Sequence, residues 1–135
     1  MTIHNDEEEL YPIVGVFLRD KKGCSKVLFD PKVKFEFFGE RRIDVAGLRS
    51  GKIIGVEVKK EFTPRGALEA LQQATIYKRA CSDVYVCFYK PEPDKVDEIT
   101  LEKFKNECIK EGIGLIFIDS SRKVEEIVNP KESDI

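Results

Sequence analysis

The sequence predicts an α/β fold with a mixed central sheet and helices on both of its faces. Toward the C-terminus, apolar strand-like runs alternate with helix-like segments, and such alternation requires crossover connections between parallel strands. In the first half, the polar turn "RSGK" at 49–52 joins two strand-like runs and predicts an antiparallel hairpin. The same sheet should therefore contain both parallel and antiparallel neighbours.

Each expected element has its own local signal. In 6–23, apolar residues recur at helical spacing, acids open the segment, basic residues close it and Gly23 ends it. Strand-like segments alternate in polarity or are rich in β-branched and aromatic residues. In chain order we expect a helix over 6–23, a strand over 32–38, two strands within 41–60, a helix over 63–81, a strand over 83–90, a helix over 97–112, a strand over 114–119 and a short edge strand over 123–128.

The composition fits a single domain over 1–128 with a flexible tail over 129–135. The chain has 135 residues, of which 41% are hydrophobic and 36% charged, enough to bury one core beneath a charged surface. With a net charge of −2, any binding of nucleic acid would depend on a local positive patch. The acidic opening residues differ from a secretory signal, and no apolar run approaches the roughly 20 residues of a membrane span. We therefore expect a soluble, cytoplasmic protein with no membrane contact.

The cysteines and the histidine do not form a metal-binding pattern. Cys24, Cys81, Cys87 and Cys108 include no C-x-x-C pair, and His4 is the only histidine. We therefore expect reduced, structural thiols and no zinc site. The sequence also lacks a G-x-G-x-x-G segment and a P-loop, so a nucleotide-binding enzyme on a doubly wound sheet has no support.

Charged residues at the end of a buried strand are the main functional signal. In "IIGVEVKK", 53–60, Glu57 and Lys59 project to the same side because strand residues alternate faces. Asp44 belongs to the preceding strand, and the hairpin turn should place it about level with Glu57. Two carboxylates and an amine would then converge at one place. The alternative is a set of solvated charges at an exposed strand end, which is the commoner meaning of an isolated E-x-K.

A cluster of this kind suits the hydrolysis of a phosphodiester. The carboxylates of Asp44 and Glu57, with the backbone carbonyl of Val58, offer the oxygen ligands that Mg²⁺ prefers, and Mn²⁺ is expected to substitute. A bound ion of this type lowers the pKa of water and neutralises the charge of a phosphate. Lys59 would orient that water or help to deprotonate it, and would stabilise the developing negative charge. These residues predict a metal-dependent site that needs no histidine.

The segment "RRIDVAGL…GKIIGVEVKK" resembles the core motif of the PD-(D/E)xK nuclease superfamily, whose members share the restriction-endonuclease-like fold. The family's two acids fall on Asp44 and Glu57 and its lysine on Lys59, while Ile43 stands where the proline of the motif would be. The resemblance covers residues 7 to about 90. Within the superfamily, the chain is similar in pattern to Mrr-like and archaeal Holliday-junction-resolvase-like nucleases. This resemblance implies a restriction-endonuclease-like core and a Mg²⁺-dependent nuclease.

The same resemblance adds helix residues to the site. "EEEL" is similar to the E-x-x-L opening helix of those nucleases, in which a glutamate reaches the metal, and this places Glu7 among the ligands. The apolar helix face favours Glu7 over Glu8, although such acids also suit a helix N-terminus without any further role. In "LQQATIY", Gln73 and Tyr77 match a glutamine and tyrosine that follow the motif in many members. Gln73 is the preferred catalytic residue, and Gln72 is the competing choice.

A nuclease also needs a positive surface for the phosphate backbone. The residues expected to contact nucleic acid lie close in sequence to the site: Lys60, Arg65, Arg42, Tyr77 and Lys78. DNA is the expected partner, and a homodimer or a protein partner could supply specificity, because one domain of this size leaves no room for a separate reading domain. The competing prediction is a restriction-like module that binds nucleic acid or protein without cleaving.

Overall fold

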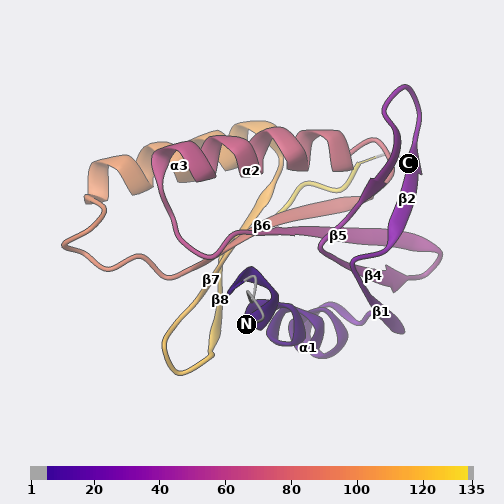
Figure 1. The fold of residues 1–135 in the computed structure, drawn as a ribbon, viewed down its shortest axis with the longest axis horizontal. Helices are drawn as coiled ribbons and strands as arrows, with labels where there is room; N and C mark the ends of the chain where they lie inside the picture. Colours follow the sequence, from indigo (N-terminus) through magenta and orange to yellow (C-terminus); the bar gives the residue numbers. More distant parts are fainter. Residues whose placement is uncertain (1–5, 134–135) are drawn as a thin grey trace, which may run out of the picture.

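The computed structural model describes residues 6–133 as helices and strands arranged in layers (Figure 1). Residues 1–5, which include His4, and residues 134–135 lie outside the described part of the chain. No helix within 6–133 is both long and apolar enough to cross a membrane. The elements are η1 (Asp6–Leu10, a 3₁₀ turn), α1 (Tyr11–Lys22), β1 (Lys26–Phe29), β2 (Lys32–Phe35), β3 (Gly39–Arg42), β4 (Val45–Arg49), β5 (Lys52–Val58), α2 (Pro64–Tyr77), β6 (Asp83–Tyr89), α3 (Glu98–Glu111), β7 (Gly114–Ile118) and β8 (Val124–Val128).

The main sheet has six strands in the order β1-β4-β5-β6-β7-β8, and its pairing is mixed. β5, β6 and β7 run parallel through the crossover helices α2 and α3, while the other pairs are antiparallel. The hairpin between β4 and β5 turns at Ser50 and Gly51, whose positive φ angles of 51° and 78° suit a tight two-residue turn. Helix α1 covers one face, and α2 and α3 cover the other (Figure 1). The predicted α/β class, mixed sheet and helices on both faces are confirmed.

The segment before this hairpin differs from the prediction. β1 was not expected as a strand, because its four residues show no clean alternation of buried and exposed positions. The strand expected over 32–38 stops at Phe35, and Phe37, with a φ of 70°, turns the chain into β3. β2 and β3 pair only with each other and form a separate two-stranded sheet. Asp44 consequently lies in the link that enters β4, immediately before that strand begins.

The predicted helices are present, but the buried face of α2 differs from the expected one. The sequence spacing predicts a face shared by Ala67, Leu71, Ala74 and Lys78. Ala67 and Ala74 are buried, whereas Leu71 is only half-buried and Lys78 lies at the C-terminal end of the helix. Tyr77 takes the position that faces the sheet and is 1% exposed. This one-residue difference brings a phenol, instead of an ammonium, to the end of β5.

Two apolar cores lie on the two faces of the sheet. Leu10 of η1 and Val14 and Leu18 of α1 pack on one face. The other core includes a cluster of aromatic rings in edge-to-face contact, with the centroid of Phe62 5.0 Å from that of Phe104 and 5.1 Å from that of Phe88. All four cysteines are buried and free, as expected of structural thiols.

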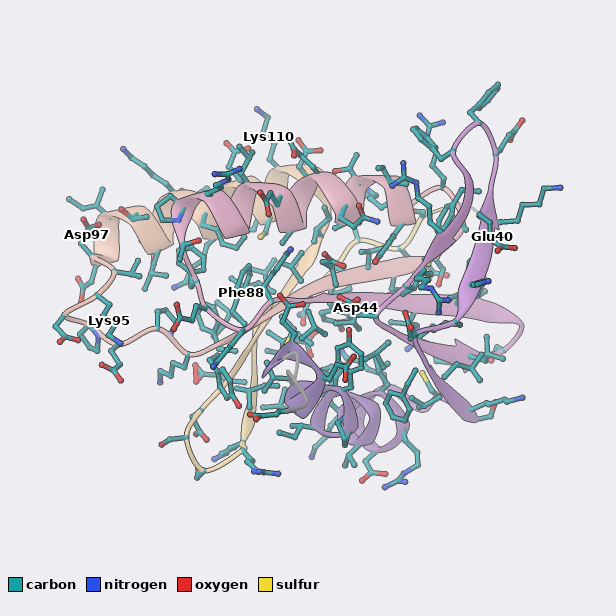
Figure 2. The ribbon with its side chains drawn as sticks, viewed as in Figure 1. Glu40, Asp44, Phe88, Lys95, Asp97 and Lys110 are labelled. Atoms are coloured by element: carbon teal, nitrogen blue, oxygen red, sulfur yellow. The ribbon has the colours of Figure 1, made fainter. Side chains whose placement is uncertain are left out.

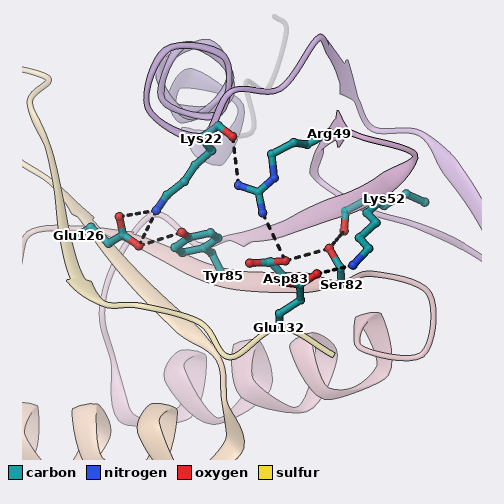
Figure 3. Close-up of polar contacts among 9 residues, drawn as sticks. Lys22, Arg49, Lys52, Ser82, Asp83, Tyr85, Glu126 and Glu132 are labelled. Atoms are coloured by element: carbon teal, nitrogen blue, oxygen red, sulfur yellow. Dashed lines mark hydrogen bonds and ion pairs between the residues drawn. The ribbon is translucent and has the colours of Figure 1, made fainter. Parts of the chain in front are cut away.

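A polar network joins α1, the sheet and the C-terminal segment (Figure 3). Lys22 forms an ion pair of 2.9 Å with Glu126, and the Tyr85 hydroxyl donates to the same carboxylate at 2.8 Å. Arg49 lies 3.8 Å from Asp83 at the start of β6. Each carboxylate in these contacts therefore has a cation beside it.

Residues 129–133, where the sequence predicts a flexible tail, are bonded to the body of the molecule. The N–H of Lys131 donates to the Gly112 carbonyl at 3.0 Å, and the N–H of Ser133 donates to the Ser82 carbonyl at 2.7 Å. Glu132 also forms an ion pair with Lys52 (Figure 3). The segment is thereby tied both to the end of α3 and to the start of β6.

Candidate active site

Asp44 and Glu57 meet at the end of the β4–β5 hairpin. Val45 pairs with Val56, so Asp44, the residue before β4, comes level with Glu57. The Asp44 carboxylate accepts a hydrogen bond from the Val58 N–H at 2.8 Å. This bond satisfies a backbone donor at the point where the β4–β5 ladder stops. The structure therefore brings the two acids together, as the hairpin register predicts (Asp44 is labelled in Figure 2).

Glu57 is a buried acid in contact with a second acid. Its side chain is only 10% exposed. Burial raises the pKa of Glu57 to about 8, and the Asp44 carboxyl adds to this rise through its charge and through a hydrogen bond between the two groups. The Tyr77 hydroxyl and the Lys59 ammonium act in the opposite direction without cancelling the rise. The raised pKa favours the protonated form of Glu57 at neutral pH.

Two tyrosines hold the acids from opposite faces of the sheet. Tyr11, at the start of α1, donates its hydroxyl hydrogen to Asp44 Oδ1 at 3.0 Å. The hydroxyl of Tyr77, at the end of α2, lies 2.9 Å from Glu57 Oε1 and 3.1 Å from the Arg42 carbonyl, so the two oxygens share one donor. Burial is the main cause that raises the pKa of both phenols, which therefore remain protonated donors.

Lys59 lies beside the acid pair and stays partly accessible. Its side chain is 24% exposed, and its Nζ is 3.9 Å from Glu57 Oε2 and 3.8 Å from Glu69 Oε2. Both distances exceed hydrogen-bond length, so neither carboxylate fixes the ammonium in one orientation. Glu69, on α2, was not predicted, and its only sequence signal is the helical spacing from Arg65, with which it pairs at 3.3 Å.

Gln73 lies behind the acid pair. It is half-buried and hydrogen-bonds to Tyr77, which in turn bonds Glu57, while Gln72 is exposed. Of the two glutamines, Gln73 is the one that bonds Tyr77, and its catalytic role stays a prediction. Gln73 therefore reaches the carboxylates only through Tyr77. In this structure it positions the Tyr77 hydroxyl, which bonds Glu57.

Glu7 is not brought into the acid pair. It is half-buried and close enough to Tyr11 for its charge to raise the pKa of that phenol. Among the residues that the structure describes, no three His, Cys, Asp or Glu side chains gather where they could hold a metal. Tyr11, four residues after Glu7, makes the contact with Asp44 in its place. Tyr11 was not predicted as a site residue. It lies 33 positions from Asp44, and no local sequence pattern indicates a contact over that separation.

The residues expected to contact nucleic acid are scattered, and Tyr77 is not on the surface. Its burial places it behind the acids, so the expected surface contact with nucleic acid does not fit the structure. Lys78 donates to a carbonyl at the end of α3 at 2.6 Å. Arg65 and Arg42 are exposed, and each pairs with a carboxylate. Lys60 is half-buried and lines a cavity of about 180 Å³.

The acid pair fits a divalent cation that prefers oxygen ligands. Asp44 and Glu57 offer carboxylate oxygens, and Val58 lies between them and Lys59 on the same strand end. Mg²⁺ commonly uses one or two carboxylates and takes its remaining ligands from water and phosphate. Burial, followed by the charge of Asp44, raises the pKa of Glu57, because burial of a carboxylate costs free energy unless a counter-charge is near. A cation would supply that charge.

Ionisation of Glu57 should destabilise the metal-free protein. A carboxyl group with a raised pKa in the folded state stabilises the fold fully below its unfolded pKa, and this stabilisation is lost as the pH rises through the folded pKa. For Glu57 the window runs from 4.5 to about 8. A shift of one pKa unit corresponds to about 1.4 kcal/mol. Between about pH 5.5 and 8.5, the free energy of unfolding of the wild type should therefore fall by at least about 1 kcal/mol more than that of Glu57→Gln.

Urea unfolding in EDTA at several pH values measures this difference. Glu102→Gln is the matched control, because Glu102 is exposed on α3 and pairs only with Lys105 at 3.1 Å. The control should keep the pH dependence of the wild type. Identical pH dependence in the wild type and Glu57→Gln would contradict a buried, charge-deficient acid pair.

Comparison of the chain with protein-family models, with curated proteins and with solved structures found no match. The chemistry of the site is therefore inferred from its own side chains.

Proposed function

We propose that this chain is a metal-dependent nuclease of the PD-(D/E)xK type with a restriction-endonuclease-like core, and that it hydrolyses phosphodiester bonds in DNA. One observation carries the proposal: two carboxyl groups, Asp44 and Glu57, are in contact at a strand end, with the amine of Lys59 beside them. The mixed sheet supports it, because the hairpin that carries the acids is followed by a crossover helix and a parallel strand.

Each residue of the site has a separate task. Mg²⁺ or Mn²⁺, held by Asp44, Glu57 and the Val58 carbonyl, would acidify a water molecule and neutralise phosphate charge. Asp44 is fixed for this task because both of its carboxylate oxygens accept hydrogen bonds. Glu57 gives up its proton to serve as a charged ligand, and Tyr77 steadies it.

Lys59 acts on the substrate side of the site. It is accessible to solvent and is not locked by its acidic neighbours. It orients the water whose oxygen attacks phosphorus, and it donates to a phosphate oxygen as negative charge develops there. The attacking water gives up a proton to solvent as its oxygen bonds to phosphorus. The bond from phosphorus to the leaving strand oxygen breaks, and that oxygen takes up a proton from solvent. Cleavage therefore requires the Lys59 amine, whereas Asp44 and Glu57 could bind the metal ion without it.

The alternative is a restriction-like module that binds nucleic acid or protein and does not cleave. The two acidic neighbours of Lys59, Glu57 and Glu69, favour it, because they balance part of the charge of the lysine without any substrate. The net charge of −2 also suits a protein partner better than DNA. Substitution of Lys59 separates the two proposals, because only a nuclease loses an activity.

Lys59→Ala should reduce cleavage by about 100-fold or more, because it removes a donor that acts on developing charge. The assay uses Mg²⁺ and Mn²⁺ with linear duplex, single-stranded DNA, a flap, a four-way junction and RNA. Lys105→Ala is the control, since Lys105 lies on α3 and pairs with Glu102. The metal-induced rise in melting temperature should persist in Lys59→Ala, because the carboxylates remain.

Cleavage by the wild type and the control alone would support the nuclease and identify its preferred substrate. Equal cleavage by Lys59→Ala would remove the proposed role of the lysine. Absence of cleavage by the wild type, together with no metal-induced stabilisation, would leave the non-catalytic module as the better account.

Gln73→Ala should lower the cleavage rate by about tenfold, whereas Gln72→Ala should leave it unchanged. Gln73 hydrogen-bonds to Tyr77 and thereby positions Glu57, but Gln72 is exposed. Because Glu57 would then be a poorer metal ligand, Gln73→Ala should also need a higher metal concentration to reach half of its maximal rate. A purely structural role would not change this concentration. Gln73→Glu, which keeps the length of the side chain but cannot donate to the Tyr77 oxygen, should not recover the rate. Equal rates in Gln73→Ala and Gln72→Ala would contradict this role.

A further inference from the structure

A separate hairpin projects from the sheet next to the acid pair. β2, β3 and the turn between them, residues 32–42, form this arm, which pairs only with itself and stands on the α2 side of the sheet (Figure 1). Figure 2 labels Glu40 on the arm and Asp44 where the chain continues into the sheet. The arm and the acid pair are therefore adjacent along the chain, separated only by Ile43.

The tip of the arm holds an aromatic side chain out in solvent. Phe37 is 88% exposed. Its φ of 70° lies in the left-handed region, which bulky residues rarely adopt. Both features cost free energy in the protein alone. Exposure of an apolar ring to water is unfavourable, and so is a left-handed backbone conformation at a bulky residue. A ligand that covers the ring would offset the first cost.

The base of the arm is firmly held, so the tip has a defined position. The ring of Phe35 is buried and stacks on Tyr77, with centroids 6.1 Å apart and an angle of 19° between planes. Phe38 contacts two guanidinium groups, those of Arg41 at 5.8 Å and Arg79 at 5.7 Å. Tyr77 is the residue that bonds Glu57, so the arm packs directly on the support of the acid pair.

The arm is positively charged although the chain as a whole is slightly acidic. Residues 32–42 contain two carboxylates, on Glu36 and Glu40, and a larger number of cations. The cations are Lys32, Lys34, Arg41 and Arg42. Positive charge attracts a phosphate backbone, and an exposed aromatic ring stacks on a base, so the two together are typical of surfaces that bind single strands.

We propose that the arm binds an unpaired nucleotide beside the phosphate that is cut, with Phe37 stacked on its base and the cations of the arm on neighbouring phosphates. This inference rests on the proposed nuclease function and names its substrate class. Stacking requires a base whose face is open, and a continuous duplex offers none except at its ends. The enzyme therefore prefers flaps, bulges and junctions between single-stranded and duplex DNA over an intact duplex.

A single tryptophan tests the stacking directly. The chain contains no tryptophan, so Phe37→Trp introduces the only indole. In a Lys59→Ala background, which prevents cleavage, its fluorescence should be quenched by DNA with a single-stranded flap and much less by blunt duplex. Ile109→Trp is the control, because Ile109 is 62% exposed on α3 and should not respond to either DNA. Anisotropy of labelled DNA measures binding in parallel.

Phe37→Ala should weaken binding of the flap DNA by about tenfold, because stacking on one base is lost, and should leave binding of a closed circular duplex, which has no ends, unchanged. Ile109→Ala should bind both as the wild type does. The substitution lies at an exposed tip, and an unchanged melting temperature would show that the fold is intact.

The outcomes separate this inference from the nuclease proposal. Binding without quenching, or an unchanged affinity of Phe37→Ala for flap DNA, would overturn the role of the arm and leave the nuclease standing. Absence of both binding and cleavage by the wild type would overturn the nuclease proposal and the inference with it. A loss of self-association in Phe37→Ala, with DNA binding unaffected, would assign the tip to a second copy of the chain and overturn the inference.

Discussion

The contact between the carboxyl groups of Asp44 and Glu57 is the constraint on which the surrounding structure depends. Two acids side by side repel each other when ionised, and burial increases that cost. Helix α1 provides Tyr11 to one acid and helix α2 provides Tyr77 to the other, so both layers of the fold must pack on the sheet for the pair to form. The N–H of Val58 completes the set and links the pair to the last residue of β5. The layers are thus joined through the site as well as through their apolar cores.

The polar network of Figure 3 shows how this chain treats charges that serve stability. There Glu126 has Lys22 at 2.9 Å and Asp83 has Arg49 at 3.8 Å, so each acid is matched by a cation. At the acid pair, Lys59 lies 3.9 Å from Glu57 and is shared with Glu69, so its charge is divided between two carboxylates. The two adjoining acids are thus less closely matched by positive charge than Glu126 is. A divalent cation bound to both carboxylates would supply the missing positive charge.

Much of this arrangement could be predicted from the sequence. The hairpin register followed from alternation and from a turn that only a few residue types favour, and it placed Asp44 level with Glu57. The arm could not be predicted, because 32–38 has the alternation of one continuous strand and no local signal marks the positive φ of Phe37. The contact of Tyr11 with Asp44 depends on how α1 packs, which local sequence does not encode. Tyr77 was expected on the surface because the inward face of α2 was misjudged by one residue.

The central claim is that the acid pair is a cation site, and calorimetric titration with Mn²⁺ tests it most directly. Titrations at neutral pH in two buffers of different ionisation enthalpy give both the affinity and the number of protons released. The account predicts that binding displaces the proton that Glu57 retains, so the wild type releases up to one proton per ion, and that Glu57→Gln releases none and binds more weakly. Absence of binding by the wild type, or equal affinity and proton release in Glu57→Gln, would contradict it.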